Sequence, residues 1–243
     1  MMRVAIHQPH YFPWLGFFDK MAKVDKFVVL DDVQLTDRSP MVRNKFLEKP
    51  SREKYLSVSV QKKGYREKKT SEILLNEPEK TLKKHQNFIL LNYSKHPYFE
   101  EIYEKLKFIF SKQYSRLLDL EMDTILIGRK LFDIHVPMVF QSELCYDRSA
   151  KNSDLMLSLC QCLDADLYLS GNGARAYMDI EEFKKRHIKV AFQEFTYPVY
   201  PQYKTESFIP NLSAMDLLFN CGIEQSREIF WNNVHSTNET DLK

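Results

Sequence analysis

Cysteine and glycine are scarce in this sequence, and both shortages limit what the protein can be. Four of the 243 residues are cysteine and six are glycine. The thiols show neither the CxxC pairs of a zinc site nor the density of a secreted disulfide scaffold, so we expect them to be reduced. They lie at Cys145, Cys160, Cys162 and Cys221. No Gly/Ser-rich or Pro-rich stretch separates two halves of different composition, which favours a single domain over 1–235 with a loose tail at 236–243.

Strong net charge and long apolar runs are also missing. The chain has 35 basic and 33 acidic residues, for a formal charge of +2, which is too small a bias to favour nucleic acid or an anionic membrane as a partner. No apolar run is long enough to cross a bilayer, and the N-terminus turns polar at His7 before a signal-peptide hydrophobic region forms. We therefore expect a cytoplasmic protein with no transmembrane segment and no nucleic-acid role.

The periodicity of the apolar residues indicates alternating strands and helices. With 44% hydrophobic and 28% charged residues, the chain has the composition of a packed globular protein. Apolar runs and alternation predict strands at 3–7, 27–30, 55–60, 136–140, 166–169 and 188–192. Helical spacing predicts helices at 15–24, 153–163 and 213–220, and a helical insertion over about 79–132 that is interrupted at His96–Pro97. The fold class is therefore α/β, with a mainly parallel sheet that is Rossmann-like or nucleotidylyltransferase-like.

Polar side chains follow the first predicted strand. His7, Gln8 and His10 lie in the turn between this strand and the next helix, at the sheet edge where α/β proteins bind ligands. A helix N-terminus there favours a phosphate or carboxylate. The alternative is an aromatic-rich turn that serves stability alone.

Two more stretches carry chemistry. Asp31 and Asp32 follow the second strand, where paired carboxylates hold Mg²⁺ in many phosphate-binding sites, although they can equally cap a turn or pair with a following arginine. Gly171 and Gly173 follow a later strand and precede Arg175, a pattern in which the backbone approaches an anion that the arginine clamps. The alternative for the glycines is a tight left-handed turn. The thiols of Cys160 and Cys162 are expected to be structural, and the chain has no GxSxG elbow.

The order of several sequence blocks resembles the WbqC-like protein family. The blocks are HQPHYFPWLGFFDK from His7, LDDVQ from Leu30, RNK from Arg43, YLSG from Tyr168, and the stretch from Leu212 to Gly222. The resemblance implies a role in bacterial gene clusters for O-antigen and other surface polysaccharides, which often build amino sugars that are then acylated. The opening also resembles ligases such as pantothenate synthetase, which form an adenylate, but the His-x-Gly-His of those enzymes is absent.

These observations lead to a hypothesis with two alternatives. We expect an enzyme that transfers an acyl or aminoacyl group to a nucleotide-linked amino sugar or another small molecule, with adenylation by ATP and Mg²⁺ as one route. The alternatives are a metal-dependent glycosyltransferase and a non-catalytic ligand-binding subunit. The expected catalytic residues are His7, His10 and Asp31, and the expected metal ligands are Asp31 and Asp32. Ligand binding is expected from Gln8, Tyr11, Trp14, Arg43, Asn44, Lys45, Ser170, Gly171, Gly173 and Arg175.

One geometric consequence can be checked directly in a structure. If the three stretches form a single site, then His7, Asp31 and Arg175 line one pocket at the carboxyl edge of the sheet.

Overall fold

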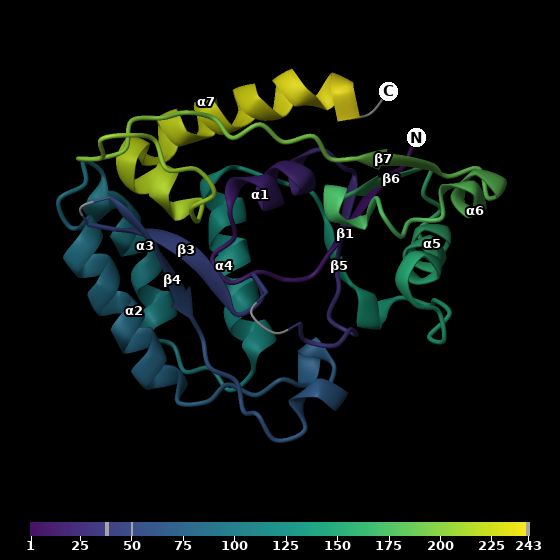
Figure 1. Cartoon of the computed structure of the whole chain (residues 1–243), viewed down its shortest axis with the longest axis horizontal. Coiled ribbons are helices and arrows are strands. Elements are labelled where there is room, and N and C mark those ends of the chain that lie inside the picture. Colours follow the sequence, from purple (N-terminus) through teal and green to yellow (C-terminus); the bar gives the residue numbers. More distant parts are fainter. Residues whose placement is uncertain (37–38, 50, 242–243) are drawn as a thin grey trace.

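A five-stranded parallel sheet organises the chain in the computed structural model (Figure 1), which describes residues 1–36, 39–49 and 51–241, with side chains described to 236. The strand order is β5-β2-β1-β6-β7, and each neighbouring pair is parallel. The strands are β1 (Arg3–His7), β2 (Lys26–Val29), β5 (Met138–Phe140), β6 (Leu167–Ser170) and β7 (Lys189–Phe192). The predicted α/β class and the mainly parallel sheet are confirmed, and the strand order is that of a Rossmann sheet without its sixth strand.

Helices cover both faces of the sheet. Successive residues of β1 point to opposite faces, so they pack into different hydrophobic clusters. Ala5 packs into one hydrophobic cluster with α1 (Leu15–Ala22), α4 (Leu117–Leu131) and α7 (Met215–Asp241). Val4 and Ile6 pack into a second cluster with α5 (Asn152–Cys162) and α6 (Ile180–Lys185). The result is a three-layer sandwich, in which α5 and α6 lie beyond the sheet from α4 (Figure 1).

The predicted helical insertion consists of three helices, α2 (Pro78–Tyr93), α3 (Phe99–Ser111) and α4. The break between α2 and α3 includes His96–Pro97, as predicted. An antiparallel hairpin of β3 (Arg43–Glu48) and β4 (Arg52–Ser57) precedes these helices and forms a separate two-stranded sheet. The strand predicted at 55–60 corresponds to β4, which begins and ends earlier in the chain. Strand β3 is not predicted from the sequence at all.

Helix α7 is longer than the sequence predicts. Gly222 has a φ of +72° and a ψ of 179°, which are not helical, so α7 consists of two helical stretches that meet at a kink. The first stretch ends close to the expected end at residue 220, and the second continues to Asp241. The ring of Tyr98 lies where a Cβ at this glycine would stand, 2.5 Å from its Cδ1. The backbone belongs to α7 as far as Asp241, so most of the segment expected to be a tail is helical, and residues 242–243 lie outside the described chain.

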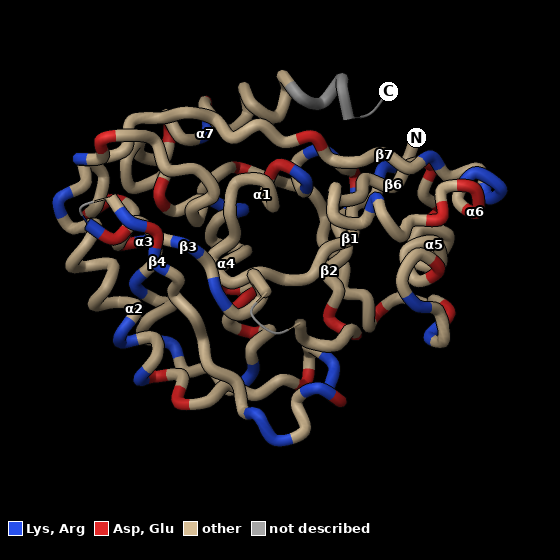
Figure 2. The backbone as a smooth tube through the Cα atoms, viewed as in Figure 1, with Lys and Arg blue, Asp and Glu red and all other residues tan. Residues whose placement is uncertain are grey.

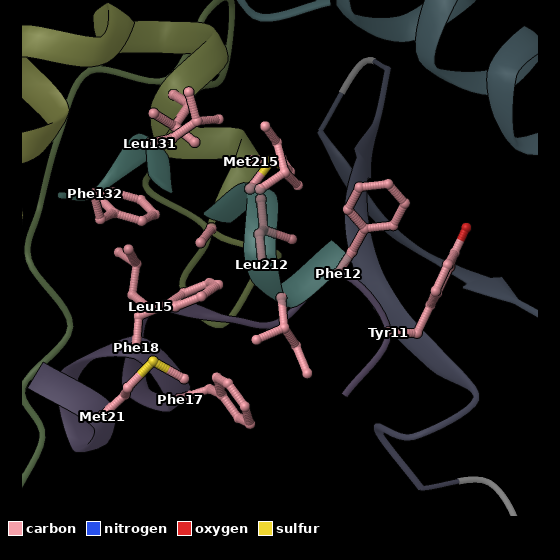
Figure 3. Packing of buried hydrophobic residues seen from close by; sticks show 14 of the residues in the cluster. Tyr11, Phe12, Leu15, Phe17, Phe18, Met21, Leu131, Phe132, Leu212 and Met215 are labelled. Carbon is pink, nitrogen blue, oxygen red and sulfur yellow. The ribbon is translucent and has the colours of Figure 1, made fainter. Parts of the chain in front are cut away.

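Helix α1 is enclosed on nearly all sides, which places charged side chains inside the molecule. Figure 3 shows its apolar residues packed with Leu131 and Phe132 at the end of α4 and with Leu212 and Met215 before and at the start of α7. The labelled apolar residues of α1 are Leu15, Phe17, Phe18 and Met21. Asp19 of α1 and Lys23, the residue after the helix, form a fully buried ion pair of 3.1 Å, and Lys20 of α1 is 2% exposed. Three buried charged residues in one short segment are unusual, because burial of a charge is costly.

Surface charges of both signs are interspersed over the molecule (Figure 2), as the small net charge suggests. All four cysteines are free, and Cys160 and Cys221 are buried. Among the described residues, no helix combines the length and the apolar character that a membrane span requires.

Candidate functional site

The candidate site lies where the direction of strand addition reverses. From β1 the chain adds β2 and β5 on one side and then β6 and β7 on the other, so the switch point of the sheet is between β1 and β6. The pairing of these two strands ends at Ala5 and Leu169, whereas β1 pairs with β2 as far as His7. A pocket of about 370 Å³ opens beyond the Ala5–Leu169 pair, where β1 and β6 are no longer paired. Its lining includes His7, Gln8, Lys20, Ser170, Gly171 and Gly173.

His7, the last residue of β1, brings a neutral imidazole to the pocket. Its Nδ1 lies 2.8 Å from the carbonyl oxygen of Gln8. Because a carbonyl only accepts, Nδ1 carries the proton and Nε2 keeps its lone pair. Burial, together with the charge of Lys20, lowers the pKa of His7 to about 3. His7 therefore serves as a hydrogen-bond acceptor at neutral pH.

Lys20 reaches the same pocket from α1. Its ammonium group donates to the carbonyl oxygen of Ile6 at 3.0 Å, beside the point where β1 and β6 cease to pair. Burial lowers the pKa of Lys20 to about 7. At neutral pH a large share of the molecules therefore carries an uncharged amine here, which can accept a proton or, once protonated, bind an anion.

Gly171 and Gly173 leave open space at the mouth of the pocket. Gly171 has a φ of −76°, and within the described residues only Gly64 and Gly222 are glycines with positive φ, so the left-handed turn considered above is excluded. A Cβ added at either pocket glycine would meet no atom within 4 Å. Neither the backbone conformation nor internal packing requires glycine at these positions. The open space leaves room for close approach of a ligand, and the binding role of the two glycines stays a prediction.

His10 and Tyr11 lie in the buried loop behind the pocket and do not line it. The ring centroid of His10 is 4.6 Å from that of His7, and burial lowers the pKa of His10 well below its usual value. Its Nδ1 has no hydrogen-bond partner within the described residues. Tyr11 shares a hydrogen bond of 2.9 Å with Nδ1 of His85. The catalytic role expected for His10 and the ligand role expected for Tyr11 remain predictions that these positions do not favour.

Asp31 and Asp32 are engaged by other side chains. Asp31 accepts hydrogen bonds from the backbone N–H and the hydroxyl of Ser142, at 2.9 and 2.6 Å. Asp32 pairs with Lys69 and Arg148 and accepts a hydrogen bond from Tyr146. Burial acts to raise the pKa of Asp32, but the hydrogen bonds from Lys69 and Tyr146 and the nearby charges outweigh burial and lower it.

Such engaged carboxylates do not fit Mg²⁺, which needs free oxygen ligands. Within the described residues, no group of three or more His, Cys, Asp or Glu side chains is arranged to hold a metal. The metal role of Asp31 and Asp32 remains a prediction without support from this geometry.

Arg175 lies outside the pocket lining. It is exposed, stacks over the ring of Phe192 at 4.2 Å and donates to the side-chain oxygen of Asn172 at 3.4 Å. The expectation that His7, Asp31 and Arg175 line one pocket is therefore not met, since only His7 does so. The carboxylate of Asp31 turns to Ser142, and the guanidinium of Arg175 turns to an aromatic face.

The remaining predicted ligand residues line a different cavity. Trp14, Arg43, Asn44 and Lys45 surround a recess of about 250 Å³, which we call the Trp14 recess. An N–H···O bond of 2.8 Å from Ser213 to the Lys45 carbonyl and a bridge between Trp14 and Ser213 hold these segments together. The predicted site residues that line a cavity thus divide between two cavities, and the others line neither.

Lys20 is the residue that sequence reasoning missed. Its side chain shares one side of the helix with Asp19 and Lys23, whereas Phe17, Phe18 and Met21 fall on the other side, which is the pattern of an ordinary solvated face. The sequence gives no signal that this face is buried. Only the packing of the folded chain identifies Lys20.

Comparisons with known proteins agree with the resemblance noted in the sequence. The model of the WbqC-like protein family matches residues 8–228. An uncharacterized protein of Mycobacterium tuberculosis, Rv1507c, is 32% identical over 226 residues, which cover 92% of this chain and 96% of that protein. No solved structure matches the chain. The matched region includes Gln8 and Lys20, the glycines after β6 and the Trp14 recess, and the chain belongs to the WbqC-like protein family.

Proposed function

We propose that this protein is an enzyme of bacterial surface-polysaccharide biosynthesis that transfers an acyl or aminoacyl group to the amine of a nucleotide-linked amino sugar held in the switch-point pocket. The observation that carries the proposal is the presence of two nitrogen bases, the half-buried His7 and the buried Lys20, in one pocket at the switch point of a Rossmann-type sheet. Nucleotides bind at this position in such sheets. The acyl-transfer chemistry comes from the family resemblance, and the pocket supplies groups that suit it.

The reaction needs a group that accepts a proton. The amine of the sugar attacks the acyl carbonyl carbon and forms the C–N bond, the bond to the leaving group breaks with its electron pair, and the amine loses a proton. With a pKa of about 7, the Lys20 amine is well matched to take that proton at neutral pH. His7, whose pKa is about 3, is too weak a base for this step, but its Nε2 can accept a hydrogen bond from the substrate and orient it.

The glycines provide the place for the phosphates. Gly171 and Gly173 leave the backbone accessible at the pocket mouth, and no side chain fills the space beside them. A diphosphate that approaches this backbone would lie near Lys20 and raise its pKa. Binding of an anionic ligand above pH 7 should therefore take up protons.

The test is a direct search for product. The purified chain is incubated with nucleotide-linked amino sugars and with acyl donors, either as thioesters or as free acids with ATP, and the acylated sugar is detected by its mass. The ratio kcat/KM should rise with pH through about 7, because Lys20 of the ligand-free protein must lose its proton to act as the base. Lys20→Met should lower kcat by roughly 10²-fold or more. Lys105→Met, an exposed lysine on α3, is the matched control and should leave kcat unchanged.

Two results would contradict the proposal. Release of free nucleoside diphosphate from a nucleotide sugar, dependent on a divalent metal, would indicate a glycosyltransferase. Tight binding of a nucleotide sugar without turnover of any donor would indicate a ligand-binding subunit. Binding itself is checked with Gly171→Val, whose side chain would occupy the open space and should abolish affinity without loss of stability.

A further inference from the structure

The Trp14 recess is a second cavity built from different parts of the chain. It is lined by Trp14 before α1, Arg43 and Lys45 on β3, Tyr55 on β4 and Asn211 before α7. None of the residues that line it also lines the switch-point pocket. Its volume of about 250 Å³ is smaller than the roughly 300–1,000 Å³ of cavities that hold drug-sized ligands. It therefore suits a molecule smaller than a whole nucleotide sugar.

The hairpin places positive charge against an aromatic ring. Arg43 and Lys45 are two residues apart on β3, so their side chains share a face of the hairpin, and Lys45 pairs directly with Tyr55 on β4. The guanidinium of Arg43 lies 4.3 Å from the centroid of the Tyr55 ring. Lys45 is paired with Glu53 at 2.6 Å, whereas no carboxylate of the described chain forms an ion pair with Arg43. The recess thus has one positive charge that no carboxylate of the described residues neutralises.

Trp14, which also lines the recess, is held in place by its neighbours. A Cβ at Gly16 would stand 2.3 Å from the indole ring, so glycine is the residue that allows the ring to lie there. The ring of Phe195 contacts the indole edge-on, with centroids 5.2 Å apart. A fixed aromatic surface costs little conformational entropy when a ligand covers it.

We propose that the Trp14 recess is a separate binding site for a monosaccharide that carries a phosphate or a carboxylate group. The apolar face of a sugar ring packs on the faces of Trp14 and Tyr55, and its anionic group pairs with Arg43. The amide of Asn211 and the ammonium of Lys45 supply hydrogen bonds to the hydroxyl groups. This site consists of residues that the proposed acyl transfer does not use. Either proposal can therefore fail without the other.

Tryptophan fluorescence gives a local readout of this site. The chain has two tryptophans, and in Trp231→Phe the remaining Trp14 reports on the recess. Glucose 1-phosphate and glucuronate should each change this emission in a saturable way, and unmodified chain should give the same Kd by titration calorimetry. Glucose and inorganic phosphate, which each lack one of the two features, should bind at least tenfold more weakly. AMP tests whether the recess prefers a nucleotide to a sugar that carries an anionic group. Tighter binding of AMP than of glucose 1-phosphate and glucuronate would overturn the assignment.

Variants then identify the groups responsible. Arg43→Gln and Tyr55→Leu should each weaken sugar-phosphate binding at least tenfold. Arg52→Gln on the same hairpin, whose guanidinium pairs with Glu48 outside the recess, is the matched control and should bind like the unmodified chain. Equal losses in Arg52→Gln and Arg43→Gln would reduce the effect to general charge attraction and refute the site. The absence of any saturable response to either sugar would refute it as well.

Discussion

Replacement of Lys20 by methionine should make the protein more stable and, by the proposal above, less active. Methionine keeps the length and much of the volume of the side chain but has no charge to desolvate. A lysine pKa that falls from 10.5 to about 7 on burial corresponds, at about 1.4 kcal/mol for each pKa unit, to a folding cost of roughly 3–5 kcal/mol. The hydrogen bond from the ammonium group to Ile6 offsets about 1.5–3 kcal/mol of this cost. We therefore expect Lys20→Met to raise the free energy of unfolding by about 1–3 kcal/mol at pH 6.

The pH dependence of this difference has a definite sign. The folded-state pKa of Lys20 lies below the unfolded one, so between about pH 7 and 10.5 the unfolded chain binds more protons and stability rises with pH. The destabilising effect is thus complete below pH 7 and is lost as the pH rises toward 10.5. The advantage of Lys20→Met should shrink over the same interval.

Urea denaturation of both proteins at pH 6, 7, 8 and 9 measures this difference, with circular dichroism as the signal. Lys105→Met, which removes an exposed lysine, is the control and should show no such trend. If Lys20→Met is instead several kcal/mol less stable at every pH, Lys20 is a structural cation and its assignment as a titrating base is wrong.

The remaining predictions concern glycine, aspartate and ligand-linked protons. Gly16→Ala should lower stability by about 1–3 kcal/mol, because the new Cβ displaces the Trp14 ring, and it should shift the tryptophan emission; an unchanged melting temperature would contradict this packing. Asp31→Asn should lower the free energy of unfolding by about 1–2 kcal/mol through the loss of one charge-assisted hydrogen bond to Ser142. This decrease should be the same in EDTA and in Mg²⁺, and a difference between the two would indicate that Asp31 is a metal ligand. Calorimetry of an anionic nucleotide at pH 8 in buffers of different ionisation enthalpy should show proton uptake, which Lys20→Met should abolish.

The sequence predicts the sheet and the helical insertion well because their signals are local. The apolar strands β1 and β2 and the helical spacing of α2 to α4 are readable from the periodicity alone. Strand β3 has no such pattern, since its sequence is Arg-Asn-Lys-Phe-Leu-Glu. Tertiary contacts stabilise it instead, including a hydrogen bond of 2.7 Å from the Leu47 N–H to the hydroxyl of Tyr93 on α2. Contacts over such a separation leave no trace in a local window.

The candidate site is harder to predict because sequence proximity to a strand end does not fix the direction of a side chain. Asp31 follows β2 at the sheet edge, as expected, but its carboxylate bonds Ser142 in the loop after β5. Arg175 follows the pocket glycines, but it stacks on Phe192 at the end of β7. Both partners come from other parts of the chain, so no local stretch of sequence shows where either side chain points.

The loop between β1 and α1 explains why one sequence block contributes to both cavities. Its first residue, Gln8, lines the switch-point pocket, and its last, Trp14, lines the Trp14 recess. Between them Phe12 adopts a φ of +42°, a strained conformation for a bulky residue that persists only where the surroundings impose it. Asn44 supplies part of that restraint, because its side-chain amide donates to the Phe12 carbonyl at 2.7 Å, and Thr124 accepts from the Phe12 N–H at 3.0 Å. Asn44, predicted as a ligand residue, therefore also fixes the loop whose two ends supply one wall of each cavity.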